Sequence, residues 1–426
     1  MTAGAINVIK NNSNITFCMN PQITFFKSVY RKYTKFVRTE TQTNAISLGT
    51  APTEISILIA NNGNLLANIS LGIKTTSPLS PRNGSNIEND IGTKIFKQAV
   101  LKLKNYQIEK LTSKYINMLA RLNNPISTNS TYQIDNQTIS CANGNRYQNM
   151  SLCGGVINKG DSGIFSASRS EPNCSYTNFN MIIPLPFSFS KDTGSAIPVF
   201  LFYEDPTDIK LDVLIDGNWL KSDKSICINT DIPKIALSAI CTWYDISEYE
   251  QRRFKSSEQE YLVEEIKDIS NPIDTFTFNI RSVFSNAPIK GLYLVCNGTF
   301  ADKETLHYNN IKYKLKIGGV GLFNSYLPHT FFSKKNIYEY FVGCNYAETL
   351  TKFNTTKIEG NVAFIPFCLK MSDGPSGSIN SRNALDLEIG LDSDGNDKIN
   401  IDLYIIYYNI LKISSGKSVK YVYTGY

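Results

Sequence analysis

The sequence predicts an all-β protein in which one β domain is used twice. Short apolar runs recur along the chain and are separated by Gly, Pro, Asn and Asp, which is typical of a sandwich or a barrel. The chain has 24 Tyr and 23 Phe but only two Trp, a balance that favours sheets and interfaces over helix bundles. A proline-bounded pattern of strand, loop and strand occurs in both halves.

The two copies of this pattern keep a nearly constant spacing. Met181–Leu220 reads as a strand, a loop marked by prolines, a strand, a turn and a strand, and a weaker copy follows at Val362–Asn380. Pro184 lies 366 − 184 = 182 residues before Pro366, and Gly194 lies 377 − 194 = 183 residues before Gly377. Proline-bounded loops are common in β proteins, so a chance match is the alternative to duplication.

Length and composition set the class of protein. The 426 residues suffice for two domains of about 200 residues each. Hydrophobic residues at 42% allow two cores, and a net charge of +6 with scattered Lys and Arg argues against a dedicated nucleic-acid binder. No apolar run reaches membrane-spanning length and the N-terminus lacks a signal-peptide core, so we expect a cytoplasmic protein.

The cysteines are dispersed and include no Cys-x-x-Cys pair. An odd number without clustering indicates reduced, partly buried thiols and not a disulfide framework. The nine positions are Cys18, Cys141, Cys153, Cys174, Cys227, Cys241, Cys296, Cys344 and Cys368.

We expect an N-terminal arm and two domains. Residues 1–22 are polar and form the arm, residues 23–222 the first domain and residues 223–426 the second, with a polar connection at Lys221–Pro233. The first domain contains a long irregular loop at 123–180. Loops of this length are usually functional, so an outer loop or a subunit clamp is one interpretation, and a variable insertion without a task is the other.

In the first domain, the sequence predicts both strands and helices. Ile23–Gln42 has apolar residues at helical spacing, and we prefer a short helix that caps the sandwich to a basic segment that binds an acidic partner or a membrane. Ile55–Leu71 reads as a hairpin broken at Asn61-Asn62-Gly63. Strands with one solvent-exposed face follow within residues 91–111, and Ser113 is the expected N-cap of a helix at Ser113–Leu122.

In the second domain, a short helix is expected at Ser247–Phe254, with Glu248, Glu250, Arg252 and Arg253 able to form ion pairs. The expected strands are Ile235–Tyr244, Tyr261–Ile266, Thr275–Ile280, Ile289–Cys296, Ile311–Ile317, Ile337–Val342, Leu385–Leu391 and Ile399–Leu411.

No catalytic, cofactor-binding or metal-binding residue is predicted. The two histidines, His307 and His329, lie in loops away from any motif that would make a nucleophile or a metal site. Asp392–Asp397 lacks the Gly and Glu of a calcium loop and reads as a hairpin turn. Gly318–Gly321 has no following Lys and is not a phosphate loop.

Five segments spread over residues 20–423 carry motifs of a known family. They are NPQITFFKSVYRKYTKFVRTETQ, IPLPFSFSKDTGSAIP, YDISEYEQRRFKSSEQEYLVEEI, GPSGSINSRNALDLEI and IYYNILKISSGKSVKYVY. In their order and spacing they resemble the major capsid protein family of the nucleocytoplasmic large DNA viruses. Two positions depart from the family pattern: Ser188 replaces a frequent aromatic residue, and Gln251 separates Glu250 from Arg252.

The resemblance implies two tandem eight-stranded jelly rolls with short helices in loops. It also implies a homotrimeric, pseudo-hexagonal capsomer of an icosahedral virion assembled in the host cytoplasm. The implied partners are neighbouring capsomers, minor capsid and penton proteins and a nearby internal membrane, without sequence-specific nucleic-acid binding.

Two other functions are compatible with the residues. One is a minor capsid paralogue or an assembly scaffold of the same fold. The other is a glycan-binding β-sandwich, which would normally present exposed tryptophans; this chain has only Trp219 and Trp243, both in strand-like contexts.

Overall fold

The computed structural model describes most of the chain from Lys35 onward. The described residues are 35–47, 54–75, 86–87, 91–103, 106–122, 130–134, 137–141, 156–157, 165–166, 180–202, 209–216, 235–270, 277–279, 286–299, 311–323, 325–340, 362–369, 371, 375–382, 385–391, 398–414 and 418–421. The predicted arm at 1–22, most of the loop at 123–180 and the Lys221–Pro233 connection lie outside them. Among the described residues, no helix is long and apolar enough to span a membrane.

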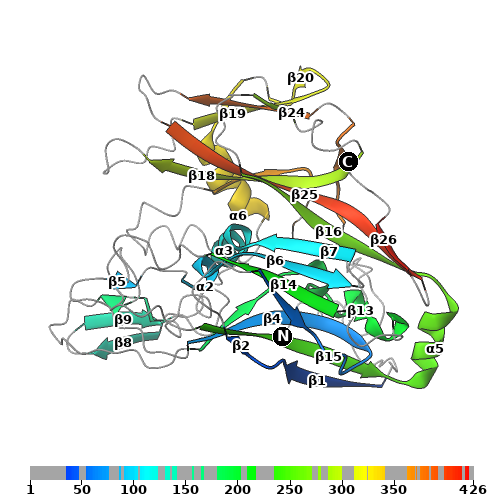
Figure 1. Ribbon diagram of the computed structural model, residues 1–426. Helices are drawn as coiled ribbons and strands as arrows, with labels where there is room; N and C mark the ends of the chain where they lie inside the picture. Colours follow the sequence, from blue (N-terminus) through cyan, green and yellow to red (C-terminus); the bar gives the residue numbers. More distant parts are fainter. Residues whose placement is uncertain are drawn as a thin grey trace, which may run out of the picture. The chain divides into compact units, whose positions relative to one another are not determined.

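The first half forms an antiparallel sandwich (Figure 1). One sheet has the order β1-β15-β4-β12, with β2 paired to β15 and β13 to β4, and the other has the order β3-β14-β6-β7. The strands are β1 (Phe36–Gln42), β2 (Ile46–Ser47), β3 (Glu54–Leu58), β4 (Leu65–Thr75), β6 (Phe96–Leu103), β7 (Tyr106–Thr112), β12 (Asn180–Pro184), β13 (Ile197–Pro198), β14 (Ile209–Ile215) and β15 (Ile235–Ile246).

The second half forms a sandwich of the same design. One sheet has the order β16-β25-β18-β22, with β26 paired to β25 and β23 to β18, and the other has the order β17-β24-β19-β20, with β21 paired to β19. The strands are β16 (Gln259–Ser270), β17 (Thr277–Asn279), β18 (Pro288–Thr299), β19 (Ile311–Ile317), β20 (Val320–Gly321), β21 (Leu327–Pro328), β22 (Val362–Pro366), β23 (Ile379–Asn380), β24 (Leu385–Leu391), β25 (Lys398–Ser414) and β26 (Ser418–Tyr421).

Short helices and small sheets complete the described elements. The helices are α2 (Ile91–Lys94), α3 (Ser113–Leu122), η1 (Ser188–Ser190), η2 (Thr193–Ser195), η3 (Val199–Phe202), α5 (Glu248–Ser256), η6 (Phe331–Asn336) and α6 (Ile337–Tyr340). The small sheets consist of β5 (Asn86–Ile87) with β11 (Phe165–Ser166), and of β8 (Ser130–Ile134), β9 (Gln137–Cys141) and β10 (Val156–Ile157).

The strand order of both sandwiches is that of a jelly roll. If the eight main strands of each half are numbered along the chain, one sheet runs 1-8-3-6 and the other 2-7-4-5, in both halves. The prediction of two tandem eight-stranded jelly rolls is therefore confirmed. The sequence repeat has a structural basis too, since Pro184 ends β12 and Pro366 ends β22, which are the sixth strands of the two jelly rolls.

The pairing of β15 bears on the expected domain boundary at 222/223. β15 lies after that boundary, but it hydrogen-bonds with β1, β2 and β4 as the last strand of the first jelly roll. The change from one jelly roll to the next therefore falls at α5, between β15 and β16. The predicted ion pairs of α5 are present: Arg252 with Glu248 at 3.6 Å and Arg253 with Glu250 at 3.4 Å.

Two predicted hairpins are wrong. β3 and β4, on either side of Asn61-Asn62-Gly63, belong to different sheets, and so do β24 and β25, on either side of residues 392–397. In both cases the chain passes from one sheet of a sandwich to the other. The local sequence indicates where the chain can turn, whereas the pairing of each strand depends on strands far away in the chain.

Two helix and strand assignments also need correction. The end of the predicted Ile23–Gln42 helix is strand β1, because pairing with β15 overrides its local helical spacing. The predicted strand at Ile337–Val342 begins as helix α6, in which Ile337 is fully buried. Lys335 in the preceding helix η6 forms an ion pair with Glu339 of α6 one turn later, at 3.4 Å. A short apolar run is compatible with the period of a helix and with that of a strand, so tertiary packing decides which of the two forms.

Gly291 provides a test of how closely the second jelly roll is packed. A Cβ at this position would lie 2.8 Å from Cε2 of Phe364 and 3.1 Å from the Ile365 carbonyl. We expect Gly291→Ala to lower the free energy of unfolding by about 1–3 kcal/mol in urea denaturation. Gly194→Ala is the control, since only the flexible Asp192 carboxylate lies near, and it should change stability by less than about 0.5 kcal/mol. Equal effects would contradict the packing argument.

Candidate functional site at the contact between the two jelly rolls

The outer face of the β16-β25-β18-β22 sheet is buried against the first jelly roll. Phe364, Tyr293 and Tyr404 lie side by side on β22, β18 and β25 and are at most 1% exposed. They belong to the apolar cluster that contains the first jelly roll's core, not to the core of their own sandwich. The ring of Tyr115 on α3 packs 5.7 Å from the ring of Tyr404.

Successive side chains along β18 and β22 point to opposite faces of the sheet, and both faces are buried. On β18, Leu292 and Leu294 point into the core of the second jelly roll, whereas Tyr293 joins the cluster shared with the first. Ala363 and Phe364 on β22 divide in the same way. Strands buried on both faces read as continuous apolar runs, which explains GLYLVC and VAFIP in the sequence. The contact is therefore built as a second hydrophobic core.

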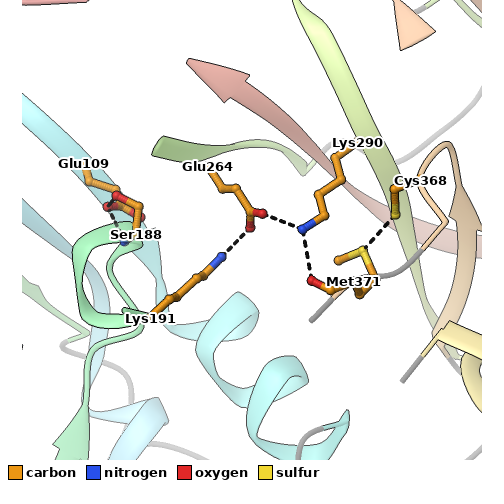
Figure 2. Close-up of polar contacts among 7 residues, drawn as sticks. All are labelled: Glu109, Ser188, Lys191, Glu264, Lys290, Cys368 and Met371. Atoms are coloured by element: carbon orange, nitrogen blue, oxygen red, sulfur yellow. Dashed lines mark hydrogen bonds and ion pairs between the residues drawn. The ribbon is translucent and has the colours of Figure 1, made fainter. Parts of the chain in front are cut away.

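A chain of charged groups crosses the same contact (Figure 2). Lys191, just after η1 in the first jelly roll, forms an ion pair with Glu264 on β16 in the second. The other carboxylate oxygen of Glu264 accepts a hydrogen bond from Lys290 on β18. Lys290 is fully buried, donates to the Met371 carbonyl at 3.0 Å and lies 5.6 Å from the ring centroid of Tyr408.

The two lysines keep Glu264 ionised. Burial by itself would raise the pKa of Glu264, but the charges of Lys191 and Lys290 and their hydrogen bonds outweigh it and lower this pKa below its ordinary value. A lysine as deeply buried as Lys290 needs a partner, because an unpaired buried charge is strongly unfavourable. Glu264 therefore fixes β16, β18 and the loop of Lys191 relative to one another.

A second ion pair joins the jelly rolls at α3. Lys114 Nζ lies 3.0 Å from Asp402 Oδ2 on β25. The Lys114 side chain is largely exposed while Asp402 is buried. An exposed lysine contributes modestly to stability, so this pair orients α3 more than it strengthens the contact.

Glu109 lies beside the contact and is buried on β7. Its Oε2 accepts the Ser188 backbone N–H at 2.8 Å and the Ser188 hydroxyl at 2.9 Å, while Oε1 has no hydrogen-bond partner among the described residues. Burial raises the pKa of Glu109 to about 7, although the Ser188 hydrogen bonds and the Lys191 charge oppose the rise. Glu109 therefore holds the η1 turn, and with it Lys191, against β7.

The residues considered from the sequence are structural where the structure describes them. His329 is buried and shares a 2.8 Å hydrogen bond with the Tyr313 hydroxyl, and Trp243 is buried with its indole N–H donated to Thr41 at 2.8 Å. A buried Trp243 offers no platform for a glycan. His307 and Trp219 lie outside the described residues.

The described thiols agree with the expectation of reduced cysteines. Cys241 and Cys368 are free and buried. Burial raises the pKa of Cys241 to about 12 and that of Cys368 in the same direction, so neither thiol is activated. Within the described part of the chain, no group of three His, Cys, Asp or Glu side chains could hold a metal ion.

Sequence reasoning did not single out Lys191, Glu264, Lys290 or Glu109. A signal existed for Lys290, which is the single charge within the apolar run of β18 and has to find a buried partner. The partner could not be identified, because Glu264 lies among alternating charges on a strand whose neighbours are set by the fold. Taken together, the arrangement offers no nucleophile or metal site and acts as a joint between two domains.

Comparison with known proteins gives consistent matches. A family model described as the major capsid protein N-terminus matches residues 24–249. The major capsid protein of Pyramimonas orientalis virus is 22% identical over 414 residues and the match covers 93% of both chains. The PBCV-1 virus capsid structure aligns with a TM-score of 0.65 at 18% identity, over 94% of this chain and 100% of that chain. The Faustovirus major capsid protein aligns with a TM-score of 0.58 at 10% identity, over 97% and 96% of the two chains.

The strand order and the joint define the class as a double jelly-roll protein. The chain belongs to the viral major capsid protein family, since the family model covers more than half of it, and the match ends near the junction of the two jelly rolls at α5. It is a structural protein of the virion of a large DNA virus, and its relatives are shell proteins and not enzymes. The resemblance found in the sequence is thereby confirmed.

Removal of the Glu264 carboxylate tests how much the ion pairs with Lys191 and Lys290 contribute to stability. Glu264→Ala leaves Lys290 buried without a carboxylate partner, and we expect a loss of about 3–5 kcal/mol in the free energy of unfolding, measured by urea denaturation. Glu260→Ala on the same strand is the matched control: it breaks the partly exposed pair with Lys412 and should cost less than about 1 kcal/mol. If both variants lose similar amounts of unfolding free energy, the buried ion pairs of Glu264 stabilise the protein no more than the partly exposed pair of Glu260 does.

Glu109 gives a pH dependence with a defined sign. The pKa of Glu109 is about 7 in the folded chain and ordinarily 4.5, so the folded state holds a proton that the unfolded state releases between these values. Stability should therefore fall as pH rises from 4.5 to about 7, by up to about 3 kcal/mol, and then level off.

The comparison is between urea denaturation curves of wild type and Glu109→Gln at several pH values. The variant should lack this part of the pH dependence. Ser188→Ala, which removes one hydrogen bond that favours the ionised carboxylate, should move the fall to higher pH. If wild type and Glu109→Gln keep a constant difference across the range, the carboxyl does not titrate there.

Proposed function

We propose that three copies of this chain close into a ring, a capsomer of pseudo-hexagonal outline, and that such capsomers tile an icosahedral shell. Each chain supplies two jelly rolls of the same strand order, so three chains supply six similar units. Six similar units around one axis form a tile with six similar edges, which suits a closely packed lattice.

The observation that supports this proposal is the form of the contact inside the chain. The second jelly roll uses a sheet face, whereas the first uses strand β7, helix α3 and turn η1. Such a contact is heterologous, and repetition of a heterologous contact gives a ring when the rotation closes. The apolar face and the buried Lys290 hold the two units in one geometry, as a tile requires.

We further propose the partners that this role brings. Neighbouring capsomers meet along the edges of the tile, and minor capsid and penton proteins bind where the lattice bends. The basic segment from Lys27 to Arg38 faces inward, toward minor capsid proteins or an internal membrane, and the loop at 123–180 lies at the subunit interface or on the outer surface. Assembly takes place in the host cytoplasm, without sequence-specific binding of DNA.

The mass in solution tests the capsomer. Size-exclusion chromatography with light scattering should give three times 47.7 kDa, about 143 kDa, at micromolar chain concentration. The interface should be obligate, so the trimer is expected to persist on dilution to the nanomolar range. A mass of 47.7 kDa at all concentrations would contradict the proposal.

A further inference from the structure

Lys191 lies close to two carboxylates and pairs with one of them. Its Nζ forms the ion pair with Glu264 across the joint, whereas Glu109 lies on the other side of the η1 turn, as Figure 2 shows. The turn keeps these groups near one another: the Lys191 backbone N–H donates to the Ser188 carbonyl at 3.4 Å, and the Ser188 backbone N–H donates to Glu109 Oε2 at 2.8 Å. The Lys191 side chain is half exposed, so it can change its rotamer without disturbing a packed core.

The backbone of the η1 turn is anchored by aromatic side chains. Phe187 and Phe189, on either side of Ser188, are buried and stack with their ring centroids 5.5 Å apart. Lifting the turn would expose both rings to water, which is unfavourable. A change at the Glu109 carboxyl therefore acts on the polar side chains of the turn and not on its backbone.

The surroundings of Glu109 offer it few charges. On β6 its strand partner is Leu101, a core residue, and the two side chains point to the same face. The adjacent Lys110 on β7 is exposed and points to the opposite face. From β16, the Glu265 carboxylate faces Glu109 and opposes its ionisation. Within the described part of the chain, the cation whose charge favours ionised Glu109 is Lys191.

The two protonation states of Glu109 call for different distributions of the lysines. Protonated Glu109 is neutral and needs no cation, so Glu264 holds both Lys191 and Lys290. Ionised Glu109 is a buried carboxylate whose Oε1 has no hydrogen-bond partner among the described residues, and a buried charge without a counterion is strongly unfavourable. If Lys191 leaves Glu264, that carboxylate still has the fully buried Lys290. The exchange therefore gives each carboxylate one cation.

We propose that loss of the Glu109 proton moves Lys191 from Glu264 to Glu109, so that one proton controls the ion pair between the two jelly rolls. With the proton in place, Lys191 links the η1 turn to β16. After its loss, Lys191 is held within the first jelly roll, and the joint depends on its apolar row and on the pair of Lys114 with Asp402. Apolar contact is non-directional, so the angle of the joint is then less firmly fixed. The exchange takes place inside one chain and does not depend on the proposed capsomer.

The exchange has a defined direction with pH. Burial raises the pKa of Glu109 to about 7, so its ionised fraction is about 3% at pH 5.5 and about 90% at pH 8. Glu264 stays ionised over this range, because the two lysines hold its pKa below the ordinary value. The ion pair across the joint should therefore prevail in mildly acidic solution and be replaced as the pH rises above neutral.

Carbodiimide coupling of the full chain records the partner of Lys191, because this reagent joins a carboxyl to an amine in contact with it as an amide. Cross-linked peptides are quantified by mass spectrometry after treatment at pH 5.5 and at pH 8. The ratio of the Lys191–Glu109 product to the Lys191–Glu264 product should rise at least about tenfold, following the ionised fraction of Glu109. The Lys316–Glu388 product, from an ion pair in the other sheet of the second jelly roll, corrects for the pH dependence of the reagent.

Glu109→Gln removes the titrating group. The amide oxygen of glutamine can still accept the Ser188 hydrogen bonds, but the side chain cannot ionise. In this variant Lys191 should stay with Glu264, so the yield of their product relative to the reference should be the same at both pH values. Circular dichroism verifies that the variant is folded.

A second pair of variants keeps Glu109 and shifts its titration. Glu265→Gln removes the charge that opposes ionisation of Glu109, so the exchange should move to lower pH, while the amide oxygen can still accept the hydrogen bond from Asn409. Glu260→Gln is the matched control on the same strand: it removes the partner of Lys412 and should leave the midpoint of the exchange unchanged.

The results decide the proposal in either direction. A product ratio that rises with pH in the wild type, together with a constant yield in Glu109→Gln and a lower midpoint in Glu265→Gln, supports the exchange. A ratio that does not change between pH 5.5 and pH 8 in the wild type overturns it. If Glu109→Gln does not fold, the comparison of Glu265→Gln with Glu260→Gln decides, and equal midpoints in these two variants overturn the exchange.

Discussion

Burial of both faces of β18, β22 and β25 is the constraint on which the rest of the structure depends. One face closes the core of the second jelly roll, and the other closes the joint with the first. Apolar area is removed from water on both sides of these strands, which stabilises this part of the chain. Because the two cores share strands, apolar burial holds the two jelly rolls against each other.

The ion pairs that connect Lys191, Glu264 and Lys290 make the orientation of an otherwise apolar contact between the jelly rolls specific. Hydrophobic contact is non-directional, so by itself it would tolerate a rotation or slip of one sheet over the other. A buried ion pair gains its energy in one geometry only, and breaking it leaves an uncompensated charge. Replacement of such a pair by apolar residues can leave stability unchanged, which suggests that its role here is to fix the angle between the jelly rolls.

The two jelly rolls differ in the residues on the outer face of their matching sheets. Their strand order is the same, but the outward row is Ile182, Gly72 and Ser238 in the first and Phe364, Tyr293 and Tyr404 in the second. Gly72 and Ser238 are buried, and Ile182 is half exposed.

The sequence by itself determined the all-β class, the duplication and most strand positions, because turn residues and apolar runs act locally. It also carried the family resemblance and excluded common catalytic motifs. Strand partners were decided only by the tertiary structure: β15 joins the first jelly roll across the expected boundary, and the strand pairs β3/β4 and β24/β25, which are consecutive in the chain, lie in different sheets. The contact between the jelly rolls could not be predicted for the same reason. Lys191, Glu264 and Lys290 are of residue types that usually lie on the surface, and only the pairing of distant strands brings them together and excludes water.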